Sequence, residues 1–262
     1  MIVNSIATVS KTYETMSRPL RIYCSDFKHY VGKFGRTHDL LNEIIAAEFA
    51  KLWGIRVPDF AYIRLLPEHV PSGLNKNHFN RLGFGSEYLE HAQELSKILL
   101  TWKANSYEIG RIVNREDLLR IGLFDLWMAN EDRNHNNANL LIQPTVEGFH
   151  LVAIDHVNIF NTNMLDKGLN VLTMEESILY SDYITLLFKK EKLQERIIAI
   201  EKEFPGYVAL CQKSLGKLLE TIPSEWGIDI ALQQRQMEQI FKLEWTKEVI
   251  QSFKLYIARN FA

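Results

Sequence analysis

One polar stretch, placed between an apolar segment and a predicted hairpin, constrains the fold of this chain more than any other feature. The stretch is residues 130–139, NEDRNHNNAN. The segment before it, Asp117 to Met128, is apolar nearly all round, which is typical of a buried central helix. The chain is therefore predicted to leave the core at Asn130 and to form a polar loop there.

Two short strands are predicted to follow this loop. Residues 140–143, LLIQ, and residues 149–154, FHLVAI, have the apolar composition of strands. Residues 144–148, PTVEG, have the composition of a turn. The pattern therefore predicts an antiparallel hairpin that returns the chain to the polar loop.

The predicted register of the hairpin brings oxygen-bearing side chains together. If Leu141 lies opposite Ala153, then Asn139 lies opposite Asp155, beside the loop that also holds Asp132. An isolated asparagine-rich segment is usually a solvated turn. Here its position between a buried helix and a strand ending in aspartate favours a metal loop. Carboxylate and amide oxygens suit Mg²⁺, which usually keeps water and substrate phosphates in its remaining positions.

Size and charge exclude several classes of protein. The chain has 262 residues, of which 47% are apolar and 24% charged, so it is long enough for one large domain or two lobes. The net charge of −2 gives no overall basic field for nucleic acid. No signal peptide or membrane-spanning run is visible, and Cys24 and Cys211 are expected to be free buried thiols. A cytoplasmic protein is therefore expected.

The first 66 residues are predicted to fold as strand, strand, helix, strand, while residues 1–17 have no decisive pattern. The three strands are expected at residues 20–24, 30–34 and 60–66. Asp39 is expected to cap the helix, which runs from about Leu40 to Trp53, and Gly54 is expected to end it.

The remainder is predicted to be mainly helical, after a loop at residues 67–83 and a short strand or extended linker at 84–89. A boundary near Glu90 divides a β-rich N-lobe, residues 1–90, from a helical C-lobe, residues 91–262. A loop is expected from Asp155 to about Asn170. Helices are then expected near residues 175–190, 192–203, 206–221 and 229–260.

Several motifs resemble those of the HipA-like kinases. They are ANEDRNHNNANLLI at 129–142, AIDH at 153–156, RPLRI at 18–22, YVGK at 30–33, NE at 42–43 and LWGIRVP at 52–58. The first two are also similar to the catalytic and metal loops of phosphatidylinositol 3- and 4-kinases. The resemblance covers roughly residues 10–160. It implies an α+β, bilobal protein-kinase-like fold, with a small β-rich N-lobe containing one helix and a large, mainly helical C-lobe.

The same resemblance implies an ATP- and Mg²⁺-dependent kinase that transfers the γ-phosphoryl group to an alcohol, with Ser or Thr of a protein as the expected acceptor. Asp132 would orient or deprotonate the acceptor hydroxyl, and Asp155 would hold Mg²⁺. Lys33 would contact the α- and β-phosphates and pair with Glu43. Local sequence alone favours an exposed strand residue for Lys33 and a first-turn helix acid for Glu43.

Other roles follow from the resemblance with alternatives left open. The second metal ligand is Asn137 by its five-residue step from Asp132, or Asn139 by its place before the strand. The backbone of Glu87, Tyr88 and Leu89 would meet adenine. The chain departs from the common kinase pattern in two ways. The segment Thr12–Ser17 stands where a glycine-rich loop is usual, and the metal motif is IDH instead of DFG.

Two other functions are compatible with these residues. One is a small-molecule or lipid kinase. The other is a nucleotide-binding pseudokinase, or a toxin–antitoxin-type interaction module with an antitoxin-like partner. Against the pseudokinase and the interaction module stands the retention of four charged residues, Lys33, Glu43, Asp132 and Asp155. His156 is expected to orient Asp155 or to pack. Residues 10–17 are expected to be a disordered N-terminus, with autophosphorylation of their hydroxyls as the alternative.

Overall fold

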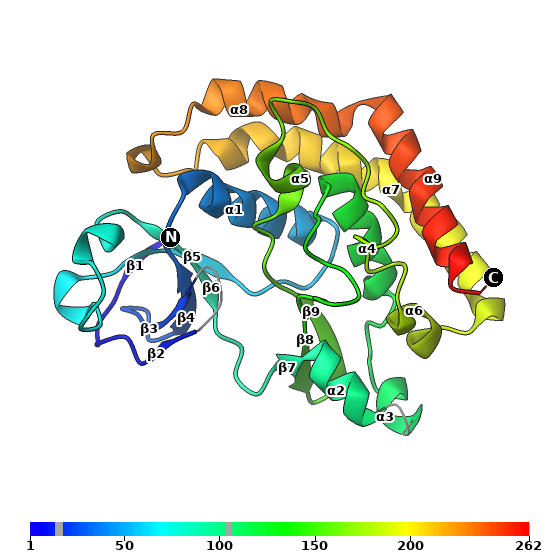
Figure 1. Ribbon diagram of the computed structural model, residues 1–262, viewed down its shortest axis with the longest axis horizontal. Helices are drawn as coiled ribbons and strands as arrows, with labels where there is room; N and C mark the ends of the chain where they lie inside the picture. The colour runs from blue at the N-terminus through cyan, green and yellow to red at the C-terminus, as the bar shows by residue number, and fades with distance from the viewer. Residues whose placement is uncertain (14–17, 103–105, 262) are drawn as a thin grey trace.

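Two sheets lie on either side of the extended segment that follows residue 87 (Figure 1). The computed structural model describes residues 1–13, 18–102 and 106–261. The larger sheet comprises β1 (Ile2–Asn4), β2 (Lys11–Thr12), β3 (Leu20–Tyr23), β4 (His29–Lys33), β5 (Phe60–Arg64) and β6 (Gly83–Glu87). The strand order is β1-β5-β6-β4-β3-β2; β1 and β5 are parallel and the other neighbours antiparallel.

The strands predicted from residues 20 to 89 are confirmed, and their apolar residues point into a core. Leu20 and Ile22 of β3 pack with Ile63 of β5 on one face of the sheet. Phe79 covers that face from the loop at residues 67–83, which contains two short 3₁₀ turns, η1 (Pro67–His69) and η2 (Lys76–Phe79). Lys11 and Thr12 form a strand, so the expectation of a disordered segment is wrong for them.

The helix of the β-rich part, α1 (Thr37–Leu52), begins earlier than predicted. Arg36 is its N-cap, and no described side chain caps this end, so the prediction that Asp39 is the cap is wrong. Asp39 instead lies in the first turn, where its carboxylate accepts from Arg36 Nε at 2.9 Å. Gly54 follows the helix with a φ of 71°, as expected for the residue that ends it.

The predicted central helix is confirmed as α4 (Asp117–Met128). Arg120 is its one residue that is not buried. The indole Nε1 of Trp127 donates to Ile240 O at 2.7 Å, and that of Trp245 donates to Trp127 O at 2.9 Å. These bonds satisfy the polar atoms of buried aromatic side chains and fix α4 against the C-terminal part of the chain.

The smaller sheet contains β7 (Gln93–Glu94), β8 (Leu140–Thr145) and β9 (Gly148–Ala153). The predicted hairpin is present, but its predicted register is wrong by one residue, because Leu140, not Leu141, lies opposite Ala153. The turn has two residues instead of five, and Thr145 pairs with Gly148 to close it. Gly148 has a φ of 143° and approaches Arg111 O so closely that a Cβ there would lie 2.5 Å from it.

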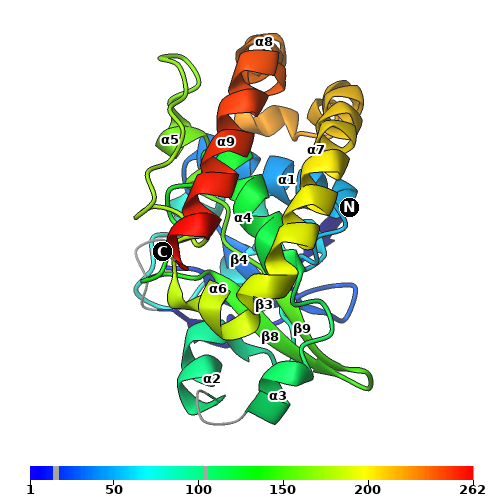
Figure 2. The same cartoon turned by 90° about the vertical axis from the view of Figure 1, so that its right-hand side faces the viewer.

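The other helices of the C-terminal part are α2 (Leu95–Trp102), α3 (Ser106–Gly110), α5 (Ile159–Asn163), α6 (Asp182–Leu187), α7 (Lys190–Leu219), α8 (Ile230–Met237) and α9 (Leu243–Arg259). The 3₁₀ turn η3 (Ser224–Trp226) precedes α8. Helix α9 packs on α4, and α7 packs on α1 (Figure 2). The proposed division at Glu90 stays a prediction.

Several predicted helix boundaries are wrong. The helix predicted near residues 175–190 is only α6, residues 182–187, and α5 lies within the loop predicted from Asp155 to about Asn170. Helix α7 continues through Pro205, where an end was expected, because one buried stripe that includes Ile200, Phe204 and Val208 runs along both of its halves. The single helix predicted for residues 229–260 is instead two helices. The 3₁₀ turn η4 (Glu238–Phe241) and the extended Lys242 separate them, and Ile240 is buried in that turn.

The two cysteines behave as predicted. Cys24 and Cys211 are both buried and free of disulfides within the described ranges. Burial raises the pKa of each thiol to about 12, so both are protonated and unreactive at neutral pH. Among the helices of the described residues, none has the length and apolarity needed to cross a membrane.

Candidate functional site

A cleft of about 460 Å³ lies between the large sheet and the hairpin β8–β9. Its lining from the β-rich part includes Val31, Lys33, Glu43, Ala47 and Phe84, and its lining from the other side includes Leu141, Ala153, Ile154, Asp155 and His156. The cleft therefore has apolar walls from both parts of the molecule and a group of charged side chains. Pockets of about 300–1,000 Å³ with this mixed lining are typical small-molecule and cofactor sites.

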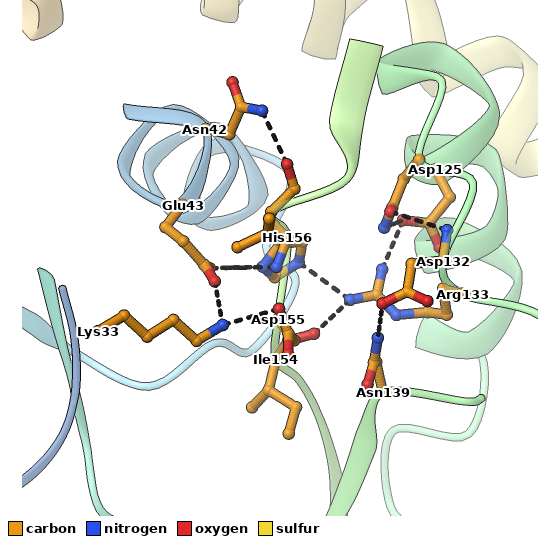
Figure 3. Close-up of polar contacts among 12 residues, drawn as sticks. Lys33, Asn42, Glu43, Asp125, Asp132, Arg133, Asn139, Ile154, Asp155 and His156 are labelled. Carbon is orange, nitrogen blue, oxygen red and sulfur yellow. Dashed lines mark hydrogen bonds and ion pairs between the residues drawn. The ribbon is translucent and has the colours of Figure 1, made fainter. Parts of the chain in front are cut away.

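Lys33 connects the two parts of the molecule inside this cleft. Its ammonium forms an ion pair with Glu43 of α1 and lies 2.7 Å from Asp155 Oδ1 (Figure 3). The Lys33 side chain is 11% exposed and that of Glu43 is 3% exposed, so the exposed-strand expectation for Lys33 is wrong. Glu43 lies beyond the first turn of α1, so the helix dipole does not account for it.

The charges in this group determine one another's protonation. Burial favours the neutral acid and raises the pKa of Glu43, against the opposing effect of the Lys33 ammonium. Burial has the same effect on Asp155, but Lys33 and Arg133 outweigh it and hold the Asp155 pKa below its usual value. Asp155 is therefore an ionised carboxylate with one oxygen on Lys33.

Asp132 lies in the loop after α4 and is held by two asparagine side chains. Asn137 Nδ2 donates to Asp132 Oδ1 at 3.0 Å, and Asn139 Nδ2 donates to Asp132 Oδ2 at 3.1 Å. Because each amide donates its nitrogen to Asp132, each Oδ1 is left facing away from that carboxylate. The Asn139 carbonyl also accepts from Ile154 N at 3.0 Å, in place of the predicted pairing with Asp155.

The backbone is left-handed at three positions around the polar loop. Ala129 ends α4 with a φ of 49°, Asn139 precedes β8 with a φ of 45°, and Asp155 follows β9 with a φ of 57°. Alanine and aspartate adopt this conformation at an energetic cost, and such strain is common at functional sites. The surrounding contacts therefore impose the direction in which the loop enters and leaves the site.

Sequence reasoning missed a second buried group of polar side chains directly behind the cleft. Arg133, fully buried, donates to Asp125 Oδ1 of α4 at 2.5 Å and to Ile154 O at 2.8 Å. Asn130 Nδ2 also donates to Asp125 Oδ1, at 2.9 Å. One signal was available in the sequence: Asp125 is the one charged residue in the buried run Ile121–Met128.

His156 joins this buried group to the cleft. Arg133 Nη2 lies 3.2 Å from His156 Nε2, and an arginine only donates, so Nε2 is the acceptor and Nδ1 carries the proton. The backbone N–H of His156 donates to Glu43 Oε2 at 3.1 Å. Burial, reinforced by Arg133 and Lys33, lowers the pKa of His156 well below its usual value, so the ring is neutral.

The segment after the hairpin is fastened to the loop that holds Asp132. Within α5, residues 160–163 have left-handed backbone angles. The Glu131 carboxylate accepts from Asn161 Nδ2 at 3.1 Å and from Thr162 Oγ1 at 2.7 Å. On the other side, Asn42 of α1 donates to Val157 O at 2.8 Å. These contacts fix the chain immediately before and after the cleft.

The three residues predicted to meet adenine line the same cleft, at the end of β6. The Glu87 N–H donates to Asp59 O, and the Tyr88 N–H donates to His29 O, each at 2.7 Å. The Leu89 N–H has no partner among the described residues. Of the three backbone donors, the one at Leu89 is therefore the one available to a ligand.

Part of the segment predicted to stand in for a glycine-rich loop also reaches the cleft. Lys11 and Tyr13, at β2, contribute to its lining. The Tyr88 ring stacks under the guanidinium of Arg21, with 4.0 Å to the ring centroid, and Arg21 pairs with Lys11 in the sheet. Residues 14–17 lie outside the described part of the chain, and with them most of that segment and half of the suggested autophosphorylation region, residues 10–17.

The donor set suits a hard cation held by few protein ligands. In the described ranges, no group of three or more His, Cys, Asp or Glu side chains is close enough to bind one metal ion. Asp155 and the amide oxygens of Asn137 and Asn139 remain as candidate ligands. Mg²⁺ is commonly bound in this way, by one or two carboxylates together with water and substrate phosphates. The residues present therefore fit Mg²⁺ bound together with a phosphate-bearing ligand.

Comparison with known proteins agrees with this geometry. A family model described as HipA-like kinase matches residues 6–255. The crystal structure of a Helicobacter pylori proinflammatory kinase, CtkA, is similar over 99% of this chain and 99% of that chain, with a TM-score of 0.60 and 11% sequence identity. A structure of WaaP in complex with acyl carrier protein is similar over 82% of this chain and 89% of that chain, with a TM-score of 0.39 and 16% identity. None of the curated proteins compared with the chain matches it.

The family match spans nearly the whole chain, from the segment before β2 to within α9. The similarity to CtkA shows that the fold is that of a kinase, with a β-rich N-terminal part and a helical C-terminal part. The predicted α+β kinase-like fold is therefore confirmed. The chain belongs to the HipA-like kinase family and is a phosphotransferase of that kind.

Proposed function

We propose that this protein is an ATP- and Mg²⁺-dependent kinase that transfers the γ-phosphoryl group to the hydroxyl of a serine or threonine in another protein. The observation that carries the proposal is the position of Lys33, between Glu43 and Asp155, in a cleft that also contains the free Leu89 N–H. One cavity is thus lined by an ammonium that can contact phosphate, a carboxylate that can bind a metal ion and a backbone N–H that can donate to a nucleotide base.

In this proposal the nucleotide base lies between the apolar side chains of the two parts of the molecule. Val31 lies on one wall, and Leu141 and Ile154 on the other. The Leu89 N–H donates to the base. Lys33 contacts the phosphates while Glu43 keeps its ammonium in place, which is how a lysine–glutamate pair acts in kinases.

Asp155 and one of the two asparagines would hold Mg²⁺ in this cleft. When bound, Mg²⁺ supplies positive charge that neutralises the phosphate oxygens during transfer. The Asn137 and Asn139 side chains both contact Asp132, so both are candidate ligands, with Asn137 preferred. Mn²⁺ titration of Asn137→Ala and Asn139→Ala distinguishes them, because the true ligand is the one whose loss weakens Mn²⁺ binding in the presence of ATP.

Asp132 would act on the acceptor hydroxyl. Its carboxylate accepts a hydrogen bond from that hydroxyl and aligns the oxygen with the γ-phosphorus, and it takes up the proton as the new O–P bond forms and the bond to ADP breaks. Positioning and charge stabilisation dominate phosphoryl transfer. The two asparagine N–H donors fix the Asp132 carboxylate without neutralising its charge.

Labelled ATP and the Asp132→Asn variant test the proposal. We expect transfer to protein acceptors in a lysate to fall by roughly a hundredfold or more, as for the loss of a positioned acid–base group. ATP affinity should change by less than about tenfold, because the group acts on turnover more than on binding. Full transfer by Asp132→Asn would refute the role of Asp132.

The other proposed readings give different results in the same assay. Transfer to small molecules or lipids without labelled protein would indicate a small-molecule or lipid kinase. ATP binding by the wild-type protein with no labelled product in any fraction would indicate a pseudokinase or a toxin–antitoxin-type interaction module.

A further inference from the structure

A second cavity, larger than the cleft, lies at the opposite side of the loop that holds Asp132. Its volume is about 720 Å³. One wall is the loop itself, through His135 and Asn136, and the other is formed by α2, by α6 with the residues before it, and by the end of α9. These elements gather at one end of the molecule, where the chain ends (Figure 2). We call this cavity the acceptor groove.

The wall of the acceptor groove is fixed in place. Asn260, after α9, donates through Nδ2 to Leu179 O at 2.7 Å and to Tyr256 O at 3.0 Å. Ser181, buried at the start of α6, donates to Ile178 O at 2.5 Å. These bonds join the end of α9 to the segment before α6, so the groove is preformed and a ligand does not have to order it.

The chemistry of the lining favours a cation. Glu175 and Asp182 both line the groove, and within the described residues neither carboxylate has an ion-pair partner. Arg259 is the single arginine or lysine in the lining as described, so carboxylates outnumber it. The tyrosine rings of residues 180 and 183 lie in the same lining. Carboxylates beside aromatic faces are well suited to the side chain of arginine or lysine.

We propose that the acceptor groove binds the polypeptide segment that carries the phosphorylated hydroxyl, and that it selects segments with an arginine or lysine near that hydroxyl. The inference rests on the proposed function, because His135 and Asn136 belong to the loop whose Asp132 is assigned to the hydroxyl. The volume is within the range of about 300–1,000 Å³ of sites that enclose a ligand.

Peptide binding without nucleotide tests the groove separately from catalysis. Fluorescent pools of short peptides with a central serine are prepared, one enriched in Arg and Lys and one in Asp and Glu. We expect the basic pool to bind the wild-type protein about tenfold more tightly or better, a difference of about 1.4 kcal/mol, because two carboxylates line the groove against one arginine. The Glu175→Gln plus Asp182→Asn variant should lose this preference.

The matched control is Glu248→Gln, which removes an exposed acid of α9 that does not line the groove. It should keep the preference for the basic pool. Equal binding of both pools by the wild-type protein, binding of neither, or the same loss in the Glu248→Gln control would overturn the inference. The melting temperature of each variant verifies that it is folded.

Phosphate transfer to the same pools is measured separately. Tight and selective binding of basic peptides without any transfer would support the groove and refute the proposed protein kinase function. Transfer to acidic and basic pools alike, with no selective binding, would support the function and overturn the groove.

Discussion

Two groups of buried charges lie on either side of His156, and they differ in what surrounds them. The cleft group, Lys33, Glu43 and Asp155, opens to the cavity, where the Asp155 side chain is 36% exposed. The core group, Asp125 and Arg133, is enclosed, and both side chains are 0% exposed. His156 links them, because its backbone contacts Glu43 and its ring contacts Arg133.

The difference shows two uses of the same chemical groups. In the proposed function a ligand replaces a partner in the cleft group: Lys33 would leave Asp155 for a phosphate, and Asp155 would then bind a cation. In the core group no ligand reaches the charges, and Arg133 instead connects α4 to the end of β9. A buried ion pair is a weak source of net stability, but removing one partner is costly. The core group therefore maintains the loop geometry on which the cleft group depends.

The largest expected effect is the loss of one core charge. Asp125→Ala leaves the Arg133 guanidinium buried without its carboxylate, and we expect a loss of about 3–5 kcal/mol in the free energy of unfolding. Urea unfolding monitored by tryptophan fluorescence measures it. A loss below about 1 kcal/mol would show that the core group does not hold the loop, and the distinction between the two groups would fail.

The second-largest effect is expected on ligand binding by the cleft group. Lys33→Met should weaken ATP–Mg²⁺ binding by about thirtyfold, roughly 2 kcal/mol, the scale of hydrogen bonds to charged groups. The same variant should bind Mn²⁺ more tightly without nucleotide, since Asp155 loses the ammonium that lies 2.7 Å from its Oδ1. Calorimetric titration measures both constants. Weaker Mn²⁺ binding by the variant would show that Lys33 does not compete with the cation.

The third effect concerns the residue between the groups and depends on pH. His156 stays neutral in the folded protein because burial lowers its pKa well below 6.5. Below this pH the unfolded chain binds a proton that the folded chain does not, so stability falls as the pH falls. Between about pH 7.5 and pH 5.5 the wild type should lose about 1.4 kcal/mol more than His156→Gln. Parallel stability curves for the two proteins would contradict a neutral His156.

The smallest effect is expected at an exposed ion pair, which is the control for both groups. Lys254 and Glu201 join α9 to α7 at 2.7 Å, with side chains 45% and 37% exposed. Glu201→Gln should change the free energy of unfolding by less than about 1 kcal/mol, because solvent screens the pair. A change as large as that of Asp125→Ala would show that burial does not explain the difference between these pairs.

The elements that could be predicted are those whose pattern is local. Residues 117–128 were predicted as a buried helix and form α4, because an apolar sequence without a polar face has to be enclosed. The strand Leu20–Tyr23 alternates, and Phe60–Arg64 has three buried residues in a row, so both could be found from their local apolar pattern. The very short β1 and β2 lie at the two edges of the sheet, and their pairing depends on neighbours distant in sequence.

The errors also have physical causes. The register of the hairpin depends on the number of residues in its turn, and the composition of residues 144–148 does not determine that number. Pro205 was expected to end a helix, but the buried stripe on both sides of it outweighs the loss of one backbone hydrogen bond. In both cases packing between distant residues decides between locally acceptable alternatives.

For the site, the sequence by itself predicted which residues carry the chemistry. Asp132, the asparagines after it and Asp155 are close together in the chain, and their motif identified a HipA-like kinase. Only the tertiary structure decided that Lys33 is buried between Glu43 and Asp155, that Arg133 is paired with Asp125, and that the acceptor groove exists. A sequence motif shows which chemically active side chains are present. Burial and pairing depend on distant segments: Lys33 and Asp155 are 122 residues apart, and folding alone brings them together.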